Sequence, residues 1–199
     1  SALAIGNVVG SNISNILLVT GVAALLMPIT VKKGEFKQDG WILLVGTILF
    51  LTLAFRLEID IFAGFLLLFY FISFLSYSYL REKRRFRETE DLKKQSADVG
   101  SDNLVKLCVY LFLGFGGLIY GAQILVEGGV EIARKFSVSE AVIGLTIMAL
   151  GTSLPELAAT VVAAIRKQSD VALGNIVGSN IFNVVGIVGV VSIVTPLSI

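Results

Sequence analysis

The sequence contains no histidine and one cysteine, Cys108, and both shortages narrow the chemistry that it can support. Without histidine the chain lacks the side chain that most often acts as a general acid or base near neutral pH. It also lacks the combined Cys and His ligands of a structural zinc site, and one cysteine cannot form a disulfide within the chain. We interpret Cys108 as a small apolar filler in a helix. The residues favour no enzyme class, and no cofactor is expected.

Charged residues are also scarce, at 16% of the chain, whereas hydrophobic residues make up 55%. The mean hydropathy is +0.87, and the apolar residues are gathered in long runs, which is typical of an integral membrane protein. The net charge of +1 gives no reason to expect a nucleic-acid partner. The expected environment is therefore the lipid bilayer.

The apolar runs predict an all-α membrane protein with six spans. Most of them approach the ~20 residues that a helix needs to cross the hydrocarbon core. The second run is short and can cross only if its flanking polar residues lie in the interface. The predicted spans are Ala4–Met27, Trp41–Phe55, Ile61–Leu80, Leu104–Val126, Ala141–Ile165 and Val171–Ile193.

Basic residues lie mainly on one side of these spans. The side reached after the first span holds 13 Lys and Arg residues, and the other side holds three. This is a strong positive-inside bias, so the basic side is predicted to be cytoplasmic and the protein to be a multi-pass protein of the cell (inner or plasma) membrane. The basic outside residues are Arg56, Arg134 and Lys135.

A duplicated segment determines the architecture. Residues 4–16 (AIGNVVGSNISNI) recur as residues 172–184 (ALGNIVGSNIFNV), with nine identities at an offset of 168. The copies lie on the first and sixth predicted spans, five crossings apart, so they point in opposite directions. This predicts an inverted-repeat helical bundle, an architecture common in secondary transporters whose sites lie near the midplane.

Three parts of the chain follow from this reading. Residues 1–80 carry three spans of the first repeat, and residues 104–199 carry three spans of the second. Residues 81–103 contain seven basic and six acidic residues and are predicted to form a charged cytoplasmic loop. A solvated linker is the favoured reading of this loop, and a regulatory or lipid-binding segment is the alternative.

The stretch Gly151-Thr-Ser-Leu-Pro-Glu156 concentrates the candidate chemistry. Pro155 cannot donate a hydrogen bond to a carbonyl one turn earlier, so the fifth span should break or kink there. Thr152 and Ser153 add hydroxyl oxygens, and Glu156 adds the only carboxylate within the apolar part of any predicted span. Such oxygen ligands suit a hard cation such as Ca²⁺ or Na⁺. Ser153 and Glu156 also fit a capping box, which is a purely structural alternative.

Polar residues on the duplicated helices form a second candidate feature. Asn175, Ser179 and Asn183 are spaced four residues apart, so they share one helix face, and Asn7, Ser11 and Asn15 form the equivalent stripe. Helix packing through interhelical hydrogen bonds would also explain these stripes. Their inverted duplication beside a broken helix favours a cation-lining role. Asn12 and Asn180 point about 100° away and are predicted to bond neighbouring backbone.

These motifs resemble a known family. Residues 139–160 (SEAVIGLTIMALGTSLPELAAT), with residues 174–181 (GNIVGSNI) and the earlier copy, resemble the α-repeats of the sodium/calcium exchanger branch of the cation/Ca²⁺ antiporter superfamily. The resemblance implies ten helices in two inverted groups of five and Na⁺-driven Ca²⁺ exchange by alternating access. It implies a cation site with Glu156 as a main ligand and a second main carboxylate in the motif expected before Ser1. The other implied ligands are Thr152, Ser153, Ser179, Asn183, Ser11 and Asn15.

Two departures qualify this resemblance. Many relatives have Asp where this chain has Asn183, so the site carries one negative charge fewer. The proton/calcium branch typically has Glu soon after the Gly-Asn pair, whereas here Gly and Ser follow. Na⁺ is thus favoured as the driving ion, and a proton/calcium exchanger and a non-transporting helix scaffold are the alternatives.

The offset also predicts a partner for the Glu156 motif, 12 to 17 residues before Ser1. We therefore expect the chain to be a piece of a larger protein, with about two spans before Ser1 and about two after Ile199.

Overall fold

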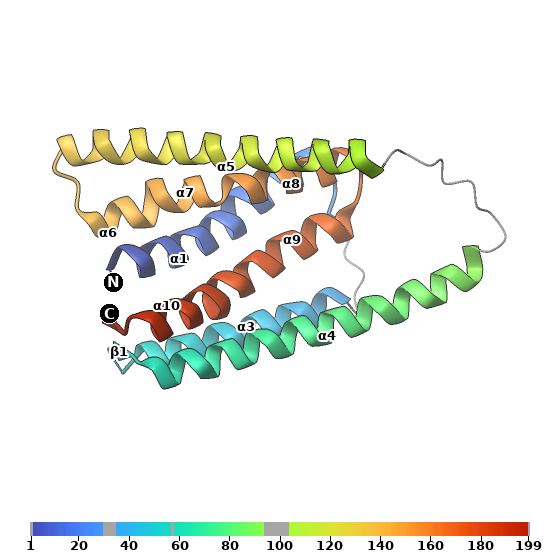
Figure 1. The fold of residues 1–199 in the computed structure, drawn as a ribbon, viewed down its shortest axis with the longest axis horizontal. Coiled ribbons are helices and arrows are strands. Elements are labelled where there is room, and N and C mark those ends of the chain that lie inside the picture. Colours follow the sequence, from blue (N-terminus) through green and yellow to red (C-terminus); the bar gives the residue numbers. More distant parts are fainter. Residues whose placement is uncertain (1, 30–34, 57, 94–103, 199) are drawn as a thin grey trace.

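The computed structural model describes residues 2–29, 35–56, 58–93 and 104–198, and most of these residues are helical. Long helices follow the apolar runs, and short loops join them (Figure 1). The first repeat contains α1 (Ala2–Ser14), η1 (Asn15–Val19), α2 (Thr20–Leu26), α3 (Glu35–Ala54) and α4 (Ile61–Lys93). The second contains α5 (Leu104–Lys135), α6 (Glu140–Ile143), η2 (Gly144–Met148), α7 (Ala149–Thr152), α8 (Leu154–Ile165), α9 (Ser169–Ile181), η3 (Phe182–Ile187) and α10 (Val188–Val194).

The helices agree with the predicted spans. Five helical segments of the described chain are long and apolar enough to cross a membrane, and the predicted second span is a shorter apolar helix, Gln38–Ala54, within α3. The protein is a multi-pass helical membrane protein. The five long segments are Ala4–Leu26, Ile61–Arg84, Val105–Lys135, Glu140–Ile165 and Ser169–Val194.

The charged segment after the third span differs from the prediction of a loop beginning at Arg81. Helix α4 continues without interruption to Lys93, and residues 94–103 lie outside the described residues. Glu, Lys and Arg are strong helix formers, and the turn they extend is already nucleated by the membrane-spanning part of α4. Arg81 on α4 donates to both carboxylate oxygens of Asp39 on α3, at 2.7 and 3.0 Å.

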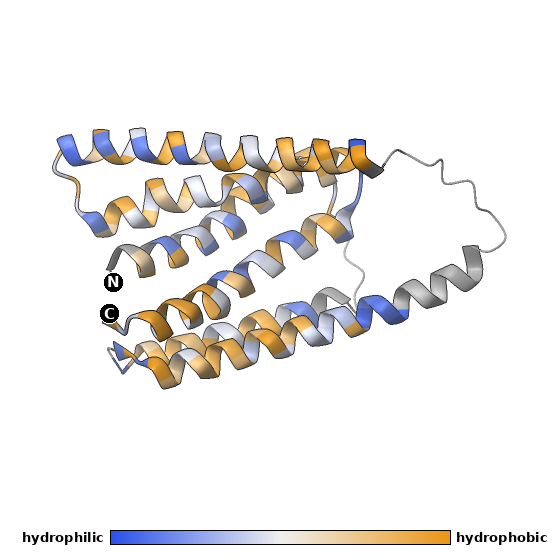
Figure 2. Ribbon diagram, in the orientation of Figure 1, coloured by the Kyte–Doolittle hydropathy of each residue, from blue (hydrophilic) through white to orange (hydrophobic). Residues whose placement is uncertain are grey.

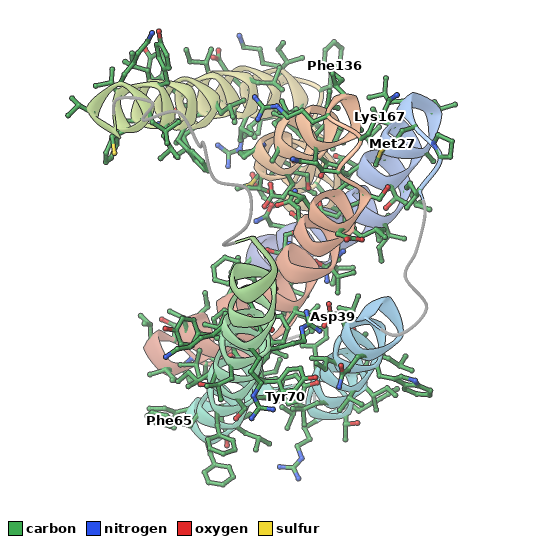
Figure 3. The ribbon with its side chains drawn as sticks, turned by 90° about the vertical axis from the view of Figure 1, so that its right-hand side faces the viewer. Met27, Asp39, Phe65, Tyr70, Phe136 and Lys167 are labelled. Carbon is green, nitrogen blue, oxygen red and sulfur yellow. The ribbon has the colours of Figure 1, made fainter. Side chains whose placement is uncertain are left out.

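The two repeat-bearing helices run antiparallel through the middle of the molecule. In Figure 1, α1 starts beside the N-terminus, whereas α9, η3 and α10 return to the same end, where the C-terminus lies. The α3–α4 pair lies on one side of them and α5 on the other, as the end view in Figure 3 also shows. The antiparallel course confirms the inversion predicted from the number of crossings.

The main apolar core lies between α4 and the last helical segments. Gly64 and Gly189 allow this contact, because a Cβ on Gly64 would lie 2.9 Å from the Gly189 carbonyl oxygen. At the end predicted to lie outside, β1 (Glu58–Ile59) pairs antiparallel with β2 (Leu197–Ser198). Figure 2 shows hydrophobic residues over α10, the C-terminal part of α3 and the N-terminal part of α4, and hydrophilic positions recurring within α1 and α9. Core residues include Leu67, Ile181, Val185 and Val188.

Three π-helical segments interrupt the central helices, which helical periodicity did not predict. η1 begins at Asn15, and η3 spans Phe182–Ile187, so the two segments fall at equivalent positions of the duplication. A π turn widens the helix and leaves backbone carbonyls with altered partners, and such turns occur frequently at functional sites. In η1 the carbonyl oxygen of Asn15 accepts a hydrogen bond from the Thr20 hydroxyl at 3.0 Å.

Candidate functional site

The predicted break in the fifth span is present at Ser153. Helix α7 ends at Thr152, Ser153 adopts φ −90° and ψ −3°, and α8 begins at Leu154 with Pro155 in its first turn. Ser153 does not form the side-chain bond of a capping box. Its Oγ instead donates to the backbone carbonyl of Ser11 on α1 at 3.4 Å, so the break is joined to the other repeat.

Helix α1 contacts the break through its own polar stripe. The hydroxyls of Ser11 and Thr152 lie 2.7 Å apart, and Thr152 also donates to Asn7 Oδ1 at 3.3 Å. Ser11 and Ser153 are buried. Gly10 allows this approach, since a Cβ there would clash with the Leu145 carbonyl oxygen. Small residues let backbones meet closely inside a bilayer, so hydroxyls from both repeats converge at the break.

Helix α9 reaches the same break from its other side. Asn15 Nδ2 donates to Ser179 Oγ at 3.2 Å, and Ser179 donates to the Asn175 carbonyl at 2.7 Å. Asn175 Nδ2 in turn donates to the backbone carbonyl of Glu156 at 3.1 Å and to Thr160 Oγ1 at 2.9 Å. The stripes on α1 and α9 therefore meet each other and the first turn of α8.

Four buried side-chain oxygens among the described residues have no hydrogen-bond partner: Ser14 Oγ, Asn15 Oδ1, Glu156 Oε2 and Asn180 Oδ1. Two of them, Glu156 Oε2 and Asn15 Oδ1, belong to predicted site residues. A buried acceptor without a donor is costly, and a buried carboxylate oxygen especially so. A cation bound beside either oxygen would satisfy it, because a cation accepts lone pairs that no N–H or O–H group reaches. The position of Glu156 in the first turn of α8 also places its carboxylate near the positive end of that helix.

Asn183 lies apart from the hydrogen bonds around Glu156. Its Nδ2 donates to Asn12 Oδ1 at 3.0 Å, and Asn12 Nδ2 donates to the Asn180 carbonyl at 3.3 Å. The prediction that Asn12 bonds backbone is confirmed, but the carbonyl belongs to the opposite repeat. Asn180 Nδ2 bonds the Ile176 carbonyl on its own helix at 2.8 Å, as predicted.

The structure thus brings most of the predicted site residues into hydrogen-bonded groups. One group joins Ser11, Thr152 and Ser153, a second joins Asn15 and Ser179 and continues through Asn175 to the backbone of Glu156, and Asn183 pairs with Asn12 beside them. Thr160 was not predicted, although its spacing of four residues from Glu156 places both on one face of α8. Within the described residues no three His, Cys, Asp or Glu side chains cluster as metal ligands. A cation here would be held by one carboxylate with amide, hydroxyl and carbonyl oxygens.

Comparison with known proteins gives concordant matches. The family model described as "Sodium/calcium exchanger protein" matches residues 1–80 and 106–199. CaxA of Alkalimonas amylolytica is 40% identical over 195 residues, which is 97% of this chain and 61% of that protein. The sodium/calcium exchanger MaX1 of Methanosarcina acetivorans is 34% identical over 233 aligned residues, covering 100% of this chain and 67% of MaX1.

Solved structures of the sodium-calcium exchanger NCX_Mj share the fold. One of them, soaked with 100 mM Na⁺ and 10 mM Sr²⁺, matches with a TM-score of 0.74 and 33% identity, covering 99% of this chain and 62% of that one. Another, soaked with zero Na⁺ and Ca²⁺, matches with a TM-score of 0.73 and 32% identity, covering 98% of this chain and 61% of that one. The chain therefore spans about three fifths of the length of several of these proteins.

Proposed function

The chain belongs to the sodium/calcium exchanger family, and from this we propose that it forms part of an antiporter that exchanges Na⁺ for Ca²⁺ across the cell membrane. The observation that carries the proposal is the buried, unpartnered Glu156 Oε2 at a helix break between two inverted repeats. Na⁺ and Ca²⁺ are the transported ions rather than resident cofactors, and the protein catalyses no covalent reaction. Its other partners are the bilayer and further helices of the same protein.

We place the transported cation beside the first turn of α8. Glu156 supplies the carboxylate, and Asn15 supplies an amide oxygen that is buried without a donor. Ser179 lies within 3.2 Å of the Asn15 amide and can turn its hydroxyl lone pairs toward the same ion. Hard cations such as Ca²⁺ and Na⁺ take oxygen ligands of these kinds.

The break adds a second set of ligands. Ser11, Thr152 and Ser153 bring hydroxyl and carbonyl oxygens from both repeats to one place. Asn183 requires a small rearrangement to join them, because its amide nitrogen is engaged with Asn12. Release of that hydrogen bond would free the Asn183 side chain to turn its Oδ1 toward the ion.

Exchange follows from competition for these oxygens. The few carboxylates of such a site cannot neutralise Ca²⁺ and Na⁺ ions together, so electrostatic repulsion disfavours their simultaneous binding. Each cation then stabilises an occluded state, and the two inverted repeats rock around the fixed site to open it to either side. A cation must leave before the other can return.

Na⁺ rather than H⁺ is the proposed driving ion. The residues that follow the Gly-Asn pairs are Gly10 with Ser11 and Gly178 with Ser179, and neither pair includes the Glu that is typical of the proton/calcium branch. The non-transporting scaffold is disfavoured because helix packing alone gives no reason to bury Glu156 Oε2 without a donor.

The proposal is tested by Ca²⁺ flux in vesicles that contain the complete gene product. An outward Na⁺ gradient should drive Ca²⁺ uptake by the wild type, and Glu156→Gln should abolish it. Glu140→Gln is the matched control, because Glu140 lies on the same span but pairs with Arg134 at the exposed outside end. Unchanged flux in Glu156→Gln would refute the site. Flux driven by a pH gradient but not by Na⁺ would favour the proton/calcium alternative.

A further inference from the structure

A cleft on the α5 side of the molecule leads to the candidate site. It has a volume of about 420 Å³, and its lining includes Gln123 and Glu127 of α5 together with Gly151, Thr152 and Pro155 at the helix break. Thr152 is also the residue whose hydroxyl contacts Ser11. The cleft therefore extends from Glu127 on α5 to Thr152, one of the proposed ligands, at the helix break.

A second cleft continues from the first toward the outside end. It has a volume of about 640 Å³ and is lined by Val126, Glu127, Glu131, Arg134 and Lys135, among others. Val126 and Glu127 line both clefts. Glu127 thus stands where the outer cleft meets the one that reaches Thr152.

The carboxylates at this outside end differ in how their charge is balanced. Glu131 pairs with Lys135 at 2.8 Å, and Glu140 pairs with Arg134 at 2.8 Å. Glu127 instead accepts a hydrogen bond from the neutral amide of Gln123 at 2.8 Å, and it makes no ion pair within the described part of the chain. It is exposed. The uncompensated negative charge on the cleft therefore lies at Glu127.

Resting on the exchange function proposed above, we propose that Glu127 is an outside entry residue that draws Na⁺ and Ca²⁺ into the cleft that reaches Thr152 at the helix break. It acts through its field rather than as a ligand in the final site. A carboxylate at the mouth of a cleft with low-dielectric walls raises the local concentration of cations and speeds their association. Gln123 holds the carboxylate toward the cleft without cancelling its charge.

The enrichment of cations near Glu127 depends on the charge of the ion. For a separation on the order of 10 Å in water, one carboxylate enriches a divalent cation about fourfold and a monovalent cation about twofold. The Ca²⁺ factor is therefore about the square of the Na⁺ factor. The effect should fade with salt, because the Debye length falls from ~30 Å at 0.01 M to ~8 Å at 0.15 M.

The test compares Glu127→Gln with Glu131→Gln in vesicles of the complete gene product, with Ca²⁺ varied on the outside face. At low ionic strength, Glu127→Gln should raise the external KM for Ca²⁺ about fourfold and that for Na⁺ about twofold. Both changes should shrink toward unity near physiological salt, and the KM at the inside face should stay at the wild-type value. Glu131→Gln should give a smaller change, because Lys135 already offsets that charge.

Two results would overturn the inference while leaving the exchange function intact. Equal external KM values in wild type and Glu127→Gln at low salt would remove any role in entry. A rise in KM that persists unchanged at high salt would make Glu127 a direct ligand and not an entry residue. If the wild type shows no Na⁺-driven Ca²⁺ flux, the exchange function itself fails, so the two failures are distinguishable.

Discussion

Replacing Gly10 by Ala should separate the two repeats where their hydroxyls meet. A Cβ at Gly10 would lie 2.6 Å from the Ala149 Cβ and would also clash with the Leu145 carbonyl oxygen. Carbon atoms in contact lie ~3.5 to 4.0 Å apart, so α1 must move away by about 1 Å. A movement of that size would lengthen the 2.7 Å contact between Ser11 and Thr152 beyond hydrogen-bonding range.

The effect of Gly10→Ala on the free energy of unfolding can be estimated from two opposing contributions. Overpacking of this kind costs about 1–3 kcal/mol, whereas Ala is favoured over Gly in a helix by about 1 kcal/mol. Gly40 is the control, because it also lies within a helix, α3, and a Cβ there meets nothing within 4 Å. Gly40→Ala should therefore keep or slightly raise stability, and the difference between the two variants should be about 2 kcal/mol.

Thermal unfolding in detergent measures this difference, and Ca²⁺ affinity gives a second readout. For a chain of this size about 2 kcal/mol corresponds to a Tm difference of roughly 4–8 °C. Gly10→Ala should also weaken Ca²⁺ binding, because it displaces ligands from both repeats, whereas Gly40→Ala should leave it close to the wild type. Equal Tm and equal affinity for the two alanine variants would refute the close approach of α1 to α7.

Two further substitutions probe hydrogen bonds and ion pairs near the site. Asn183→Asp removes the amide that donates to Asn12, so the ion-free protein should lose about 1–3 kcal/mol of its free energy of unfolding. Added Ca²⁺ should restore its Tm and should bind more tightly than to the wild type. A loss of stability that Ca²⁺ does not reverse would contradict this. Asp39→Asn removes the charge that Arg81 contacts through two nitrogens, so it should lower the free energy of unfolding by about 1 kcal/mol. The loss should be smaller at high salt. No change in Tm at low salt would show that the ion pair contributes nothing to stability.

Much of the fold could be predicted because it depends on local features of the sequence, such as a proline, a duplicated segment and long apolar runs. Pro155 predicts the break in the fifth span, and the structure ends α7 at Thr152 and begins α8 at Leu154. The duplication and the number of crossings predict the antiparallel course of α1 and α9. These inferences need only the missing N–H of proline, the length of a span and the distribution of basic residues.

Other features depend on tertiary contacts and could not be predicted. The stripe containing Asn183 follows from helical periodicity, but periodicity does not say on which side the neighbouring helix crosses. That crossing gives Asn183 the side chain of Asn12 as a partner. From the sequence, the hydroxyl of Ser153 could cap its own helix or contact another one. Because α1 lies close to the break, the hydroxyl donates to the Ser11 carbonyl. The π turns also have no signature in the spacing of apolar residues.

The charged segment shows a different limit. Its composition predicts a solvated linker, yet the same Glu, Lys and Arg residues extend α4 to Lys93. A charged composition predicts that a segment is exposed to water, but it does not predict whether that segment is a helix or a loop. A helix that has already formed in the membrane continues into water without a new nucleation step.

The central claim is that one site, organised around Glu156, binds both Na⁺ and Ca²⁺. Equilibrium binding of radioactive Ca²⁺ to the complete gene product, measured over a range of Na⁺ concentrations, tests it most directly. We predict saturable Ca²⁺ binding that Na⁺ displaces completely and that Glu156→Gln eliminates while the Glu140→Gln control retains it. Ca²⁺ binding that resists Na⁺, or that survives in Glu156→Gln, would contradict the account.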